Sequence, residues 1–282
     1  MNMKLKDGSN FPNFGLGTWF LGENPLTRAE EIKAIRTGIE MGVNLIDTAE
    51  MYGNGLSESL IGEAIRQTGR DSLYLVSKVL PENAGSTRLE KSLDATLRRL
   101  GTDHLDMYLY HWRGSYPLEE TVGRLQQMVD KGKILRWGVS NFDTDDMEEL
   151  LEIPEGRECC VNQVLYHLGS RGIEYDLLPL LRDEGIKVMA YCPLAQGGSL
   201  RSKLLSSSVV KEVAQKNGVS VFQLLLMFVL HMDGVCAIPR SGRSSHVKEL
   251  VEASRMELSE EDYRKISEAF PAPNHKTYLD VV

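Results

Sequence analysis

The chain has 282 residues, of which 42% are hydrophobic, and its formal net charge at pH 7 is -8. A chain of this length can bury a substantial core. The negative charge argues against nucleic acid and anionic membranes as partners, because both are bound by basic surfaces.

The N-terminal segment is expected to form a short β-hairpin. Two short extended stretches, residues 4–6 and 10–11, flank the turn sequence Asp7-Gly8-Ser9,. Residues 14–17 follow as the first strand of a larger sheet.

The next element is a predicted helix over residues 27–41. Ile32, Ile35 and Ile39 fall on one stripe of this helix,. Thr27 is expected to be its N-cap, with Glu30 three residues later as the partner in a capping box.

Strand-like and helical stretches then alternate to the end of the sequence. Helices are predicted over residues 57–67, 86–100, 118–131, 145–151, 175–183, 209–216, 221–230, 244–253 and 260–270. With residues 14–17 as the first strand, eight strands are expected. Such alternation without a low-complexity linker is typical of a parallel α/β fold.

Seven of the apolar runs end on polar residues that could take part in chemistry. These residues are Asp47 with Tyr52 just beyond, Ser77-Lys78, His111, Ser140-Asn141, Gln163, Tyr191 and Arg240-Ser241. In a parallel barrel, catalytic residues lie where strands end and the following loops begin. The pattern therefore indicates an enzyme.

The sequence favours a (β/α)8 TIM barrel over an open doubly wound sheet. The doubly wound fold usually carries a GxGxxG motif, but Gly15-Leu16-Gly17 lacks the third glycine, and the sequence has no Walker motif,. We expect one barrel domain over residues 1–282, with the N-terminal hairpin and two extra C-terminal helices.

Cysteine usage and hydrophobicity predict a cytoplasmic protein. Cys159, Cys160, Cys192 and Cys236 show no CxxC spacing, so we expect reduced thiols and no metal site,. Residues 1–15 lack a signal-peptide pattern. The longest apolar stretch, residues 221–232, is too short to span a bilayer.

Asp47, Tyr52, Lys78 and His111 form the central candidate site. Tyr52 could protonate a developing alkoxide if its pKa fell toward neutrality, and a neighbouring Lys78 ammonium would lower that pKa. Asp47 would hold the ammonium in place, and His111 would orient a substrate carbonyl. Each residue alone has an ordinary explanation, such as a turn, a solvated charge or a structural histidine.

The chain resembles the aldo-keto reductase family over nearly its whole length. The matching segments are Gly15–Trp19, Asn44–Ala49 with Tyr52-Gly53, Val76–Lys78, Leu105-Asp106 through His111-Trp112, Gly132–Ile134, Gly138–Phe142, Asn162-Gln163, Ala190–Leu194 and Ile238-Pro239. The resemblance implies a barrel that binds NADPH without a Rossmann motif and reduces aldehydes or ketones. Residues 162–179 and 190–196 are similar to a bacterial branch that reduces methylglyoxal and similar 2-oxoaldehydes.

The resemblance also assigns roles to individual residues. Tyr52 would be the proton donor, Lys78 and Asp47 its tuning pair, and His111 the carbonyl-orienting residue. Residues implied to bind the cofactor are Thr18, Trp19, Ser140, Asn141, Gln163, Tyr191, Pro193, Leu194, Ile238, Arg240, Ser241, Arg243, His246 and Glu249. Among these, Ser140, Asn141 and Gln163 would bind the carboxamide, and Tyr191 would stack on the nicotinamide. Arg240, Ser241 and Arg243 would bind the 2′-phosphate at a helix N-terminus. His246 and Leu250 depart from the family's usual arginine and asparagine.

A small carbonyl compound is the expected substrate and partner, bound by Trp19, Tyr52, His111 and Trp112. The two tryptophans are predicted to form apolar walls, although both could instead be core aromatics. Residues 113–117, a loop over residues 195–203 and the tail 271–282 are expected at the rim. Gln196-Gly197-Gly198 suggests a small or open pocket. We expect a monomer.

Two alternatives remain open at this point. The first is a redox-sensing subunit that binds cofactor mainly to regulate a partner. The second is a barrel enzyme in which Lys78 forms a Schiff base with the substrate. It leaves Tyr52, Asn141, Gln163 and Tyr191 without a role.

Overall fold

Eight apolar runs form one parallel sheet in the computed structural model, which describes residues 2–85, 87–195 and 199–282. The strands are β3 (Gly15–Gly17), β4 (Leu45–Asp47), β5 (Tyr74–Val79), β6 (Met107–Tyr110), β7 (Trp137–Ser140), β8 (Val161–Leu165), β9 (Lys187–Tyr191) and β10 (Val235–Ala237). Each strand pairs in parallel with the next along the chain. The predicted strands and their order are confirmed.

The sheet closes into a barrel between its first and last strands. Single parallel bridges join Phe14 to Ala237 and Gly17 to Arg240. The Gly17 amide donates to the Pro239 carbonyl at 3.0 Å. A Cβ at Gly17 would lie 2.7 Å from the Ile238 carbonyl oxygen, so only glycine allows this approach. The predicted (β/α)8 barrel is confirmed.

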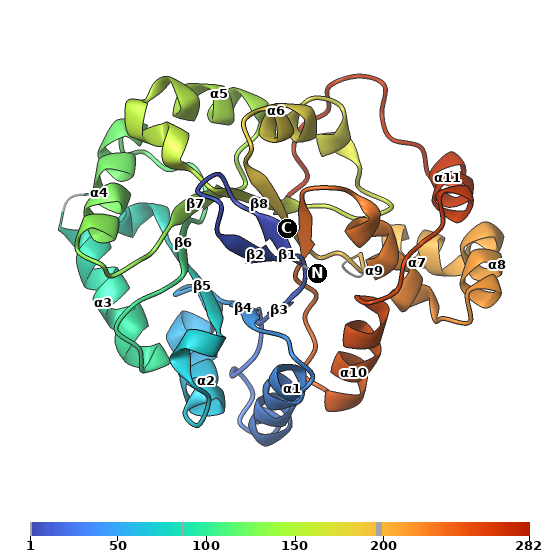
Figure 1. Ribbon diagram of the computed structural model, residues 1–282, viewed down its shortest axis with the longest axis horizontal. Coiled ribbons are helices and arrows are strands. Elements are labelled where there is room, and N and C mark those ends of the chain that lie inside the picture. Colours follow the sequence, from blue (N-terminus) through green and yellow to red (C-terminus); the bar gives the residue numbers. More distant parts are fainter. Residues whose placement is uncertain (1, 86, 196–198) are drawn as a thin grey trace.

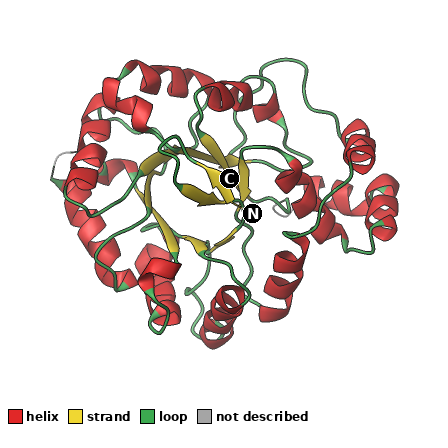
Figure 2. Cartoon of the chain, viewed as in Figure 1, coloured by secondary structure: helices red, strands yellow, loops and turns green. Residues whose placement is uncertain are grey.

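Helices surround the barrel (Figures 1 and 2). They are α1 (Arg28–Glu40), α2 (Leu56–Ile65), α3 (Arg88–Leu100), α4 (Leu118–Asp130), α5 (Thr144–Glu152), α6 (Leu177–Asp183), α7 (Ser199–Ser206), α8 (Ser208–Lys216), α9 (Val221–His231), α10 (Ser244–Ala253) and α11 (Glu260–Ala269). In α3, Leu89, Leu93 and Leu97 form a buried stripe at helical spacing,. The left-handed Gly101 ends this helix at φ 71°,.

Two extra C-terminal helices were expected, and in the part of the chain that the structure describes three are additional to the eight of the barrel: α7, α8 and α11. Of these, α8 and α11 pack together outside the barrel ring (Figure 1). Lys216 of α8 pairs with Asp262 of α11 at 2.8 Å. The prediction of a loop over residues 195–203 is wrong in part, because α7 begins at Ser199. This helix is short and serine-rich, so its sequence carries little helical signal. Gln196-Gly197-Gly198 lies outside the described residues.

The expected N-cap of α1 is also wrong. Thr27 has helical backbone angles and makes no side-chain cap hydrogen bond. Its hydroxyl donates instead to Glu31 Oε1 at 2.8 Å. Glu30 does not complete a capping box either, since its carboxylate accepts hydrogen bonds from Ser244 on α10. Tertiary contacts have overridden the local pattern.

The predicted hairpin is present as β1 (Asn2–Lys4) and β2 (Asn10–Pro12), and it lies across the barrel in Figure 1. Its first strand was expected over residues 4–6 and lies two residues earlier. Phe11 is fully buried and packs edge-to-face on Tyr74, the first residue of β5, at 5.4 Å between ring centroids. Phe11 belongs to the apolar cluster that fills the barrel, with Leu45, Val76, Met107, Leu109, Val161, Met189, Cys236 and Ile238. The hairpin thus covers the amino ends of the strands and leaves the carboxyl ends for a site.

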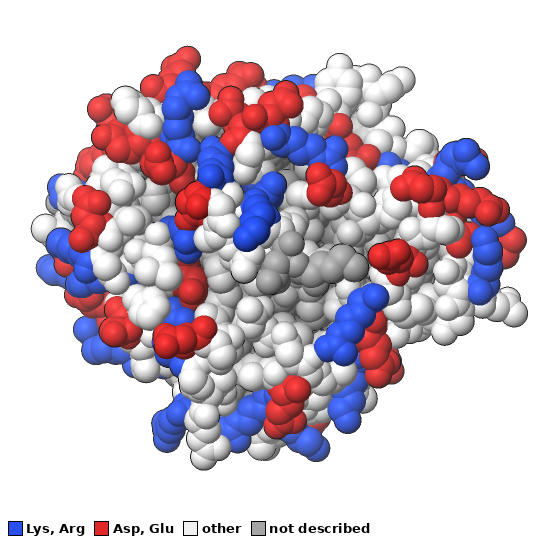
Figure 3. Space-filling view, viewed as in Figure 1, with Lys and Arg blue, Asp and Glu red and all other residues white. Residues whose placement is uncertain are grey.

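Among the described residues, no single helix has the length and apolar composition needed to cross a membrane. The pair α8 and α9 meets both criteria only when the two are taken together, across a bend of 86°. On the face shown in Figure 3, basic and acidic side chains are interspersed around the rim.

Candidate active site

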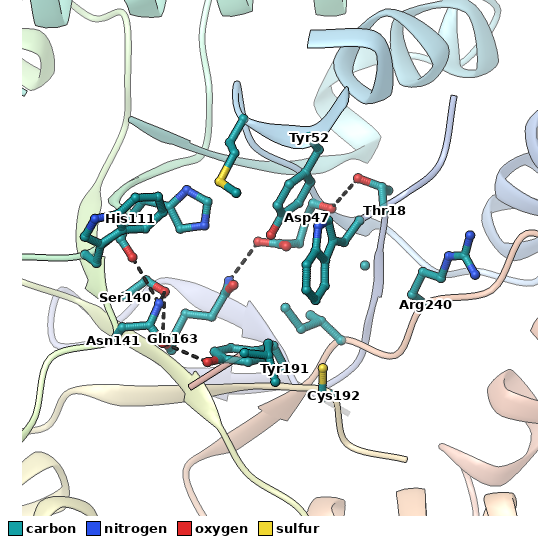
Figure 4. A pocket seen from close by; sticks show the side chains of 16 residues that line it. Thr18, Asp47, Tyr52, His111, Ser140, Asn141, Gln163, Tyr191, Cys192 and Arg240 are labelled. Carbon is teal, nitrogen blue, oxygen red and sulfur yellow. Dashed lines mark hydrogen bonds between the residues drawn. The ribbon is translucent and has the colours of Figure 1, made fainter. Parts of the chain in front are cut away.

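The polar residues predicted from the strand ends meet around one cavity of about 140 Å³ (Figure 4). From the strand ends come Asp47, His111, Ser140, Asn141 and Tyr191, whereas Gln163 comes from the middle of β8. Tyr52 and Arg240 join them from the loops that follow β4 and β10. Because parallel strands carry their carboxyl ends to the same side, residues far apart in sequence converge here.

Lys78 lies behind the cavity wall with its side chain fully buried. Its ammonium donates to Asp47 Oδ2 at 2.8 Å, to the Thr48 carbonyl at 2.8 Å and to the Tyr52 hydroxyl at 3.0 Å. Burial alone would lower the pKa of Lys78. The Asp47 carboxylate and Tyr52 together raise it by more than burial lowers it, so the net shift of the pKa is upward. All three ammonium hydrogens are used, so this charged amine is no nucleophile for a Schiff base.

A tight turn places Tyr52 in front of Lys78. Gly53 and Asn54 adopt left-handed backbone angles, with φ of 55° and 52°. Gly55 follows at φ 87° as the N-cap of α2. A Cβ at Gly53 would lie 2.8 Å from Glu23 Cγ. The glycines therefore allow the chain to turn sharply enough to bring the phenol back toward β5.

Burial raises the pKa of the Tyr52 phenol, and this effect exceeds the opposing pull of the Lys78 ammonium. The expectation of a pKa lowered toward neutrality is therefore wrong for this structure. The free energy needed to transfer the phenolate out of water is larger here than the free energy of its attraction to the neighbouring ammonium. Tyr52 keeps its proton at neutral pH, and it can still give that proton to an alkoxide, which is a far stronger base.

His111 follows β6 and faces the Tyr52 ring at 5.9 Å between centroids. Burial, assisted by the Lys78 charge, lowers the pKa of His111 to about 2. The imidazole is therefore neutral and can take part in a hydrogen bond but is no acid. Its Nδ1 atom is buried and has no hydrogen-bond partner among the residues that the structure describes. A buried polar atom in this state marks a site with unused hydrogen-bonding capacity.

Ser140 and Asn141 form a polar cluster on the other side of the cavity. Asn141 has φ 57°, which is unusual outside glycine,. Its Nδ2 donates to the His111 carbonyl at 3.1 Å and to Ser140 Oγ at 3.2 Å. Ser140 Oγ in turn donates to the Gln163 carbonyl at 2.8 Å. The strained backbone is held by contacts to two neighbouring strands.

Tyr191 and Gln163 complete this cluster. The Tyr191 hydroxyl donates to Asn141 Oδ1 at 2.8 Å. Gln163 Nε2 donates to Asp47 Oδ1 at 2.8 Å. The cavity therefore has an aromatic plane beside hydroxyl and amide groups. A nicotinamide, which is a flat ring with one carboxamide, needs this combination of groups, so the residues fit such a cofactor.

The segment expected to bind the 2′-phosphate lies between β10 and α10. Arg240 is exposed and lines the cavity. Ser241 is buried, and its Oγ accepts a hydrogen bond from the Arg243 amide at 3.2 Å. Arg243, His246 and Glu249 are exposed and lie outside the cavity lining. The cavity and the phosphate segment are thus joined through Arg240.

Most of the remaining predicted residues also lie at the cavity. Trp19, Trp112 and Ile238 line it, and so does Thr18, whose hydroxyl donates to the Asp47 carbonyl at 2.9 Å. The tryptophans are half-buried, so they are wall residues and not core aromatics. Pro193 and Leu194 lie outside the lining, with Pro193 buried in the following loop.

Four lining residues were missed from the sequence: Gly17, Met51, Cys192 and Val282. Met51 and Cys192 adjoin Tyr52 and Tyr191, so proximity to predicted residues was the available signal. Val282 belongs to the tail expected at the rim, and its backbone contacts the Tyr191 hydroxyl. Nothing in its residue type marks it as a wall residue.

Known proteins are similar to this chain over nearly its whole length. Residues 13–270 match the model of the aldo/keto reductase family. Methylglyoxal reductase YeaE of Escherichia coli is 49% identical over 97% of this chain and 96% of its own length. Glyoxal reductase of Bacillus subtilis is 36% identical over 94% of this chain and 91% of its own.

A solved structure is similar over the whole fold. The aldo/keto reductase from Klebsiella pneumoniae, crystallised with NADP and acetate, superimposes with a TM-score of 0.96 at 47% identity. The match covers 100% of this chain and 99% of that one. The chain is therefore an oxidoreductase that uses a nicotinamide cofactor, and it belongs to the aldo/keto reductase family.

Proposed function

We propose that the protein reduces small aldehydes and ketones to alcohols, with 2-oxoaldehydes such as methylglyoxal as preferred substrates. NADPH would supply the hydride for the carbonyl carbon, and Tyr52 the proton for the oxygen. One observation carries this proposal: the Tyr52 hydroxyl accepts a hydrogen bond from the buried Lys78 ammonium at 3.0 Å and faces a neutral His111 across the cavity.

Each residue has a distinct task in the reduction. Neutral His111 can hydrogen-bond the carbonyl oxygen and turn it toward Tyr52. When Tyr52 releases its proton, the Lys78 ammonium stabilises the phenolate that remains. Asp47 balances the charge of Lys78 and fixes its position through the contact at 2.8 Å. These roles require no movement of the buried pair during the reaction.

The polar cluster would hold the cofactor ring. Ser140, Asn141 and Gln163 supply hydrogen-bonding groups for the carboxamide, and Tyr191 supplies the stacking plane. Arg240, Ser241 and Arg243 support NADPH as the form used, because they lie together before α10. The 47% identical relative from Klebsiella pneumoniae was crystallised with NADP, which agrees with this choice.

Substrate size is inferred from the cavity walls. Trp19 and Trp112 are apolar, and a sugar hydroxyl desolvated against them without a partner would cost about 1–3 kcal/mol,. A compact dicarbonyl has no such hydroxyls. The relatives from Escherichia coli and Bacillus subtilis are named for methylglyoxal and glyoxal, which supports the same class.

The regulatory alternative is disfavoured by the assembled site. A subunit that only senses cofactor has no need for a phenol paired with a buried ammonium. We also propose that the protein is a cytoplasmic monomer. Cys159, Cys160 and Cys236 are buried thiols, as expected in a reducing compartment,. Light scattering on the purified protein tests the monomer.

The function is tested by NADPH oxidation under saturating cofactor. We expect kcat/KM for methylglyoxal to exceed the values for glucose and xylose. A sugar that equals or exceeds methylglyoxal would disprove the small apolar site. Binding of NADPH without turnover of any carbonyl in a broad panel would favour the regulatory role.

A further inference from the structure

A carboxylate from α1 occupies the first turn of α10. Glu30 Oε1 accepts hydrogen bonds from the Ser244 amide and the Ser244 hydroxyl, both at 3.2 Å. The N-cap residue of α10, Arg243, makes no side-chain cap hydrogen bond. The first amide of this helix, that of Ser244, is therefore bound by a side chain 214 positions away in the chain.

Glu30 is held there as an anion. The hydrogen bond from the Ser244 backbone is the main cause that lowers the pKa of the Glu30 carboxyl, and the nearby cations Lys33 and Arg243 lower it further. An anion at a helix N-terminus is also favoured by the helix dipole. The Glu30 side chain is exposed to solvent, so it can move when another anion arrives.

The first turn of α1 also packs against the loop expected to bind phosphate. A Cβ at Gly242 would lie 3.1 Å from Glu31 Cγ. Glu31 is itself fixed by the Gly22 amide and the Thr27 hydroxyl, both at 2.8 Å. Two successive glutamates of α1 thus border the segment of Arg240, Ser241 and Arg243.

We propose that Glu30 is a specificity-determining residue that weakens binding of the phosphorylated cofactor. The inference rests on the proposed use of NADPH. The carboxylate and the 2′-phosphate are both anions directed at the same cationic segment, so the phosphate must displace Glu30 or be repelled by it. NADH has no 2′-phosphate and escapes this competition. Glu30 therefore narrows the preference for NADPH that Arg240 and Arg243 create.

The test is the affinity of Glu30→Gln for the two cofactors, measured by quenching of protein fluorescence. An anion at an exposed helix N-terminus has an effect that corresponds to about a two- to fivefold change in affinity. We expect the Kd for NADPH to fall by that factor and the Kd for NADH to stay unchanged. Added salt should reduce the difference, because it screens exposed charges.

Two control variants separate charge from other effects. Glu40→Gln removes the same charge from the other end of α1, about 15 Å away at 1.5 Å per residue, and should change neither Kd. Glu30→Asp keeps the charge but shortens the side chain, and it should keep the ratio of the two Kd values closer to that of the wild type than Glu30→Gln does. Circular dichroism of each variant reports whether the fold is kept.

The outcomes distinguish this inference from the proposed function. Failure of the wild-type protein to bind either cofactor would overturn the proposed function itself. Wild-type binding of NADPH with no tightening in Glu30→Gln would overturn only the role of Glu30. Equal loss of affinity for both cofactors in Glu30→Gln would show that Glu30 is merely a helix cap. This result would also overturn the specificity role of Glu30.

Discussion

Gln163 on β8 donates a hydrogen bond of 2.8 Å to Asp47 on β4. The carboxylate that pairs with Lys78 is thereby tied to the polar cluster on the opposite side of the cavity. Asp47 Oδ2 receives the ammonium and Oδ1 receives the amide. The Lys78–Tyr52 pair and the proposed carboxamide site thus share the buried Asp47 carboxylate. A substitution in one of the two sites should therefore alter the other through Asp47.

Tyr52→Phe should abolish proton donation and leave the cofactor site intact. We expect carbonyl reduction to fall at least about 10²-fold, since general acid catalysis contributes 10²–10⁴-fold. The Kd for NADPH should stay close to the wild-type value. Steady-state kinetics with a good aldehyde, together with a binding titration, checks both. Near wild-type kcat in the variant would remove Tyr52 from the proton-donor role.

Lys78→Met should destabilise the fold, because Asp47 would be left buried without its cation. Breaking a buried ion pair in this way costs about 3–5 kcal/mol. The double variant with Asp47→Asn should regain part of that stability while activity stays low. Urea unfolding of the three proteins measures this.

Lys133→Met is the matched control, since Lys133 pairs with Glu90 and Asp94 near the surface. Its cost should be no more than about 1 kcal/mol. Equal losses in the two lysine variants would contradict a special role for the buried pair.

His111 should make the protein less stable in acid. In the folded state the pKa of His111 is about 2, against an ordinary value of 6.5. Below pH 6.5 the unfolded chain gains a proton that the folded protein does not take up until about pH 2. The free energy of unfolding should therefore fall by roughly 2 kcal/mol from pH 7 to pH 5 on account of this residue.

This contribution is measured as the difference between wild type and His111→Gln in urea unfolding at both pH values. The pKa of His167 is also lowered, to about 4, by burial, but that residue is present in both proteins and cancels. The same pH dependence in wild type and variant would show that His111 is not held neutral.

Arg240→Ala should weaken NADPH binding and hardly affect NADH, because only NADPH carries the 2′-phosphate. An exposed ion pair contributes up to about 1 kcal/mol, so we expect the Kd for NADPH to rise about two- to fivefold. Arg264→Ala, on the exposed face of α11, removes the same charge elsewhere and should change neither Kd. A parallel loss of NADH affinity would point to disruption of the loop.

The barrel and the convergence of polar residues were predictable because both follow from local patterns. Apolar runs that end in Asp47, His111, Ser140 or Tyr191 specify strands with polar carboxyl ends, and parallel pairing then brings those ends together,. The hairpin was predictable for a similar reason, since Asp7-Gly8-Ser9 favours a turn.

Features set by distant contacts were not predictable. Thr27 and Glu30 have the spacing of a capping box. Their side chains instead form hydrogen bonds with Glu31 and Ser244. The pKa of Tyr52 depends on how deeply the phenol is enclosed, which sequence spacing does not report. Val282 lines the cavity because the tail, residues 271–282, folds back over the barrel, and the course of such a tail is not encoded in a local pattern.

The closure between β3 and β10 has a consequence for how the barrel opens. It depends on isolated bridges at Phe14 and Gly17, whereas β5 and β6 share four registered residue pairs. Local opening starts where paired backbone is sparse, so amide hydrogens along this junction should exchange with solvent sooner than those of β5. Because Arg240 lies on the same junction, a ligand held there would fasten the two ends of the sheet and slow exchange at Gly17.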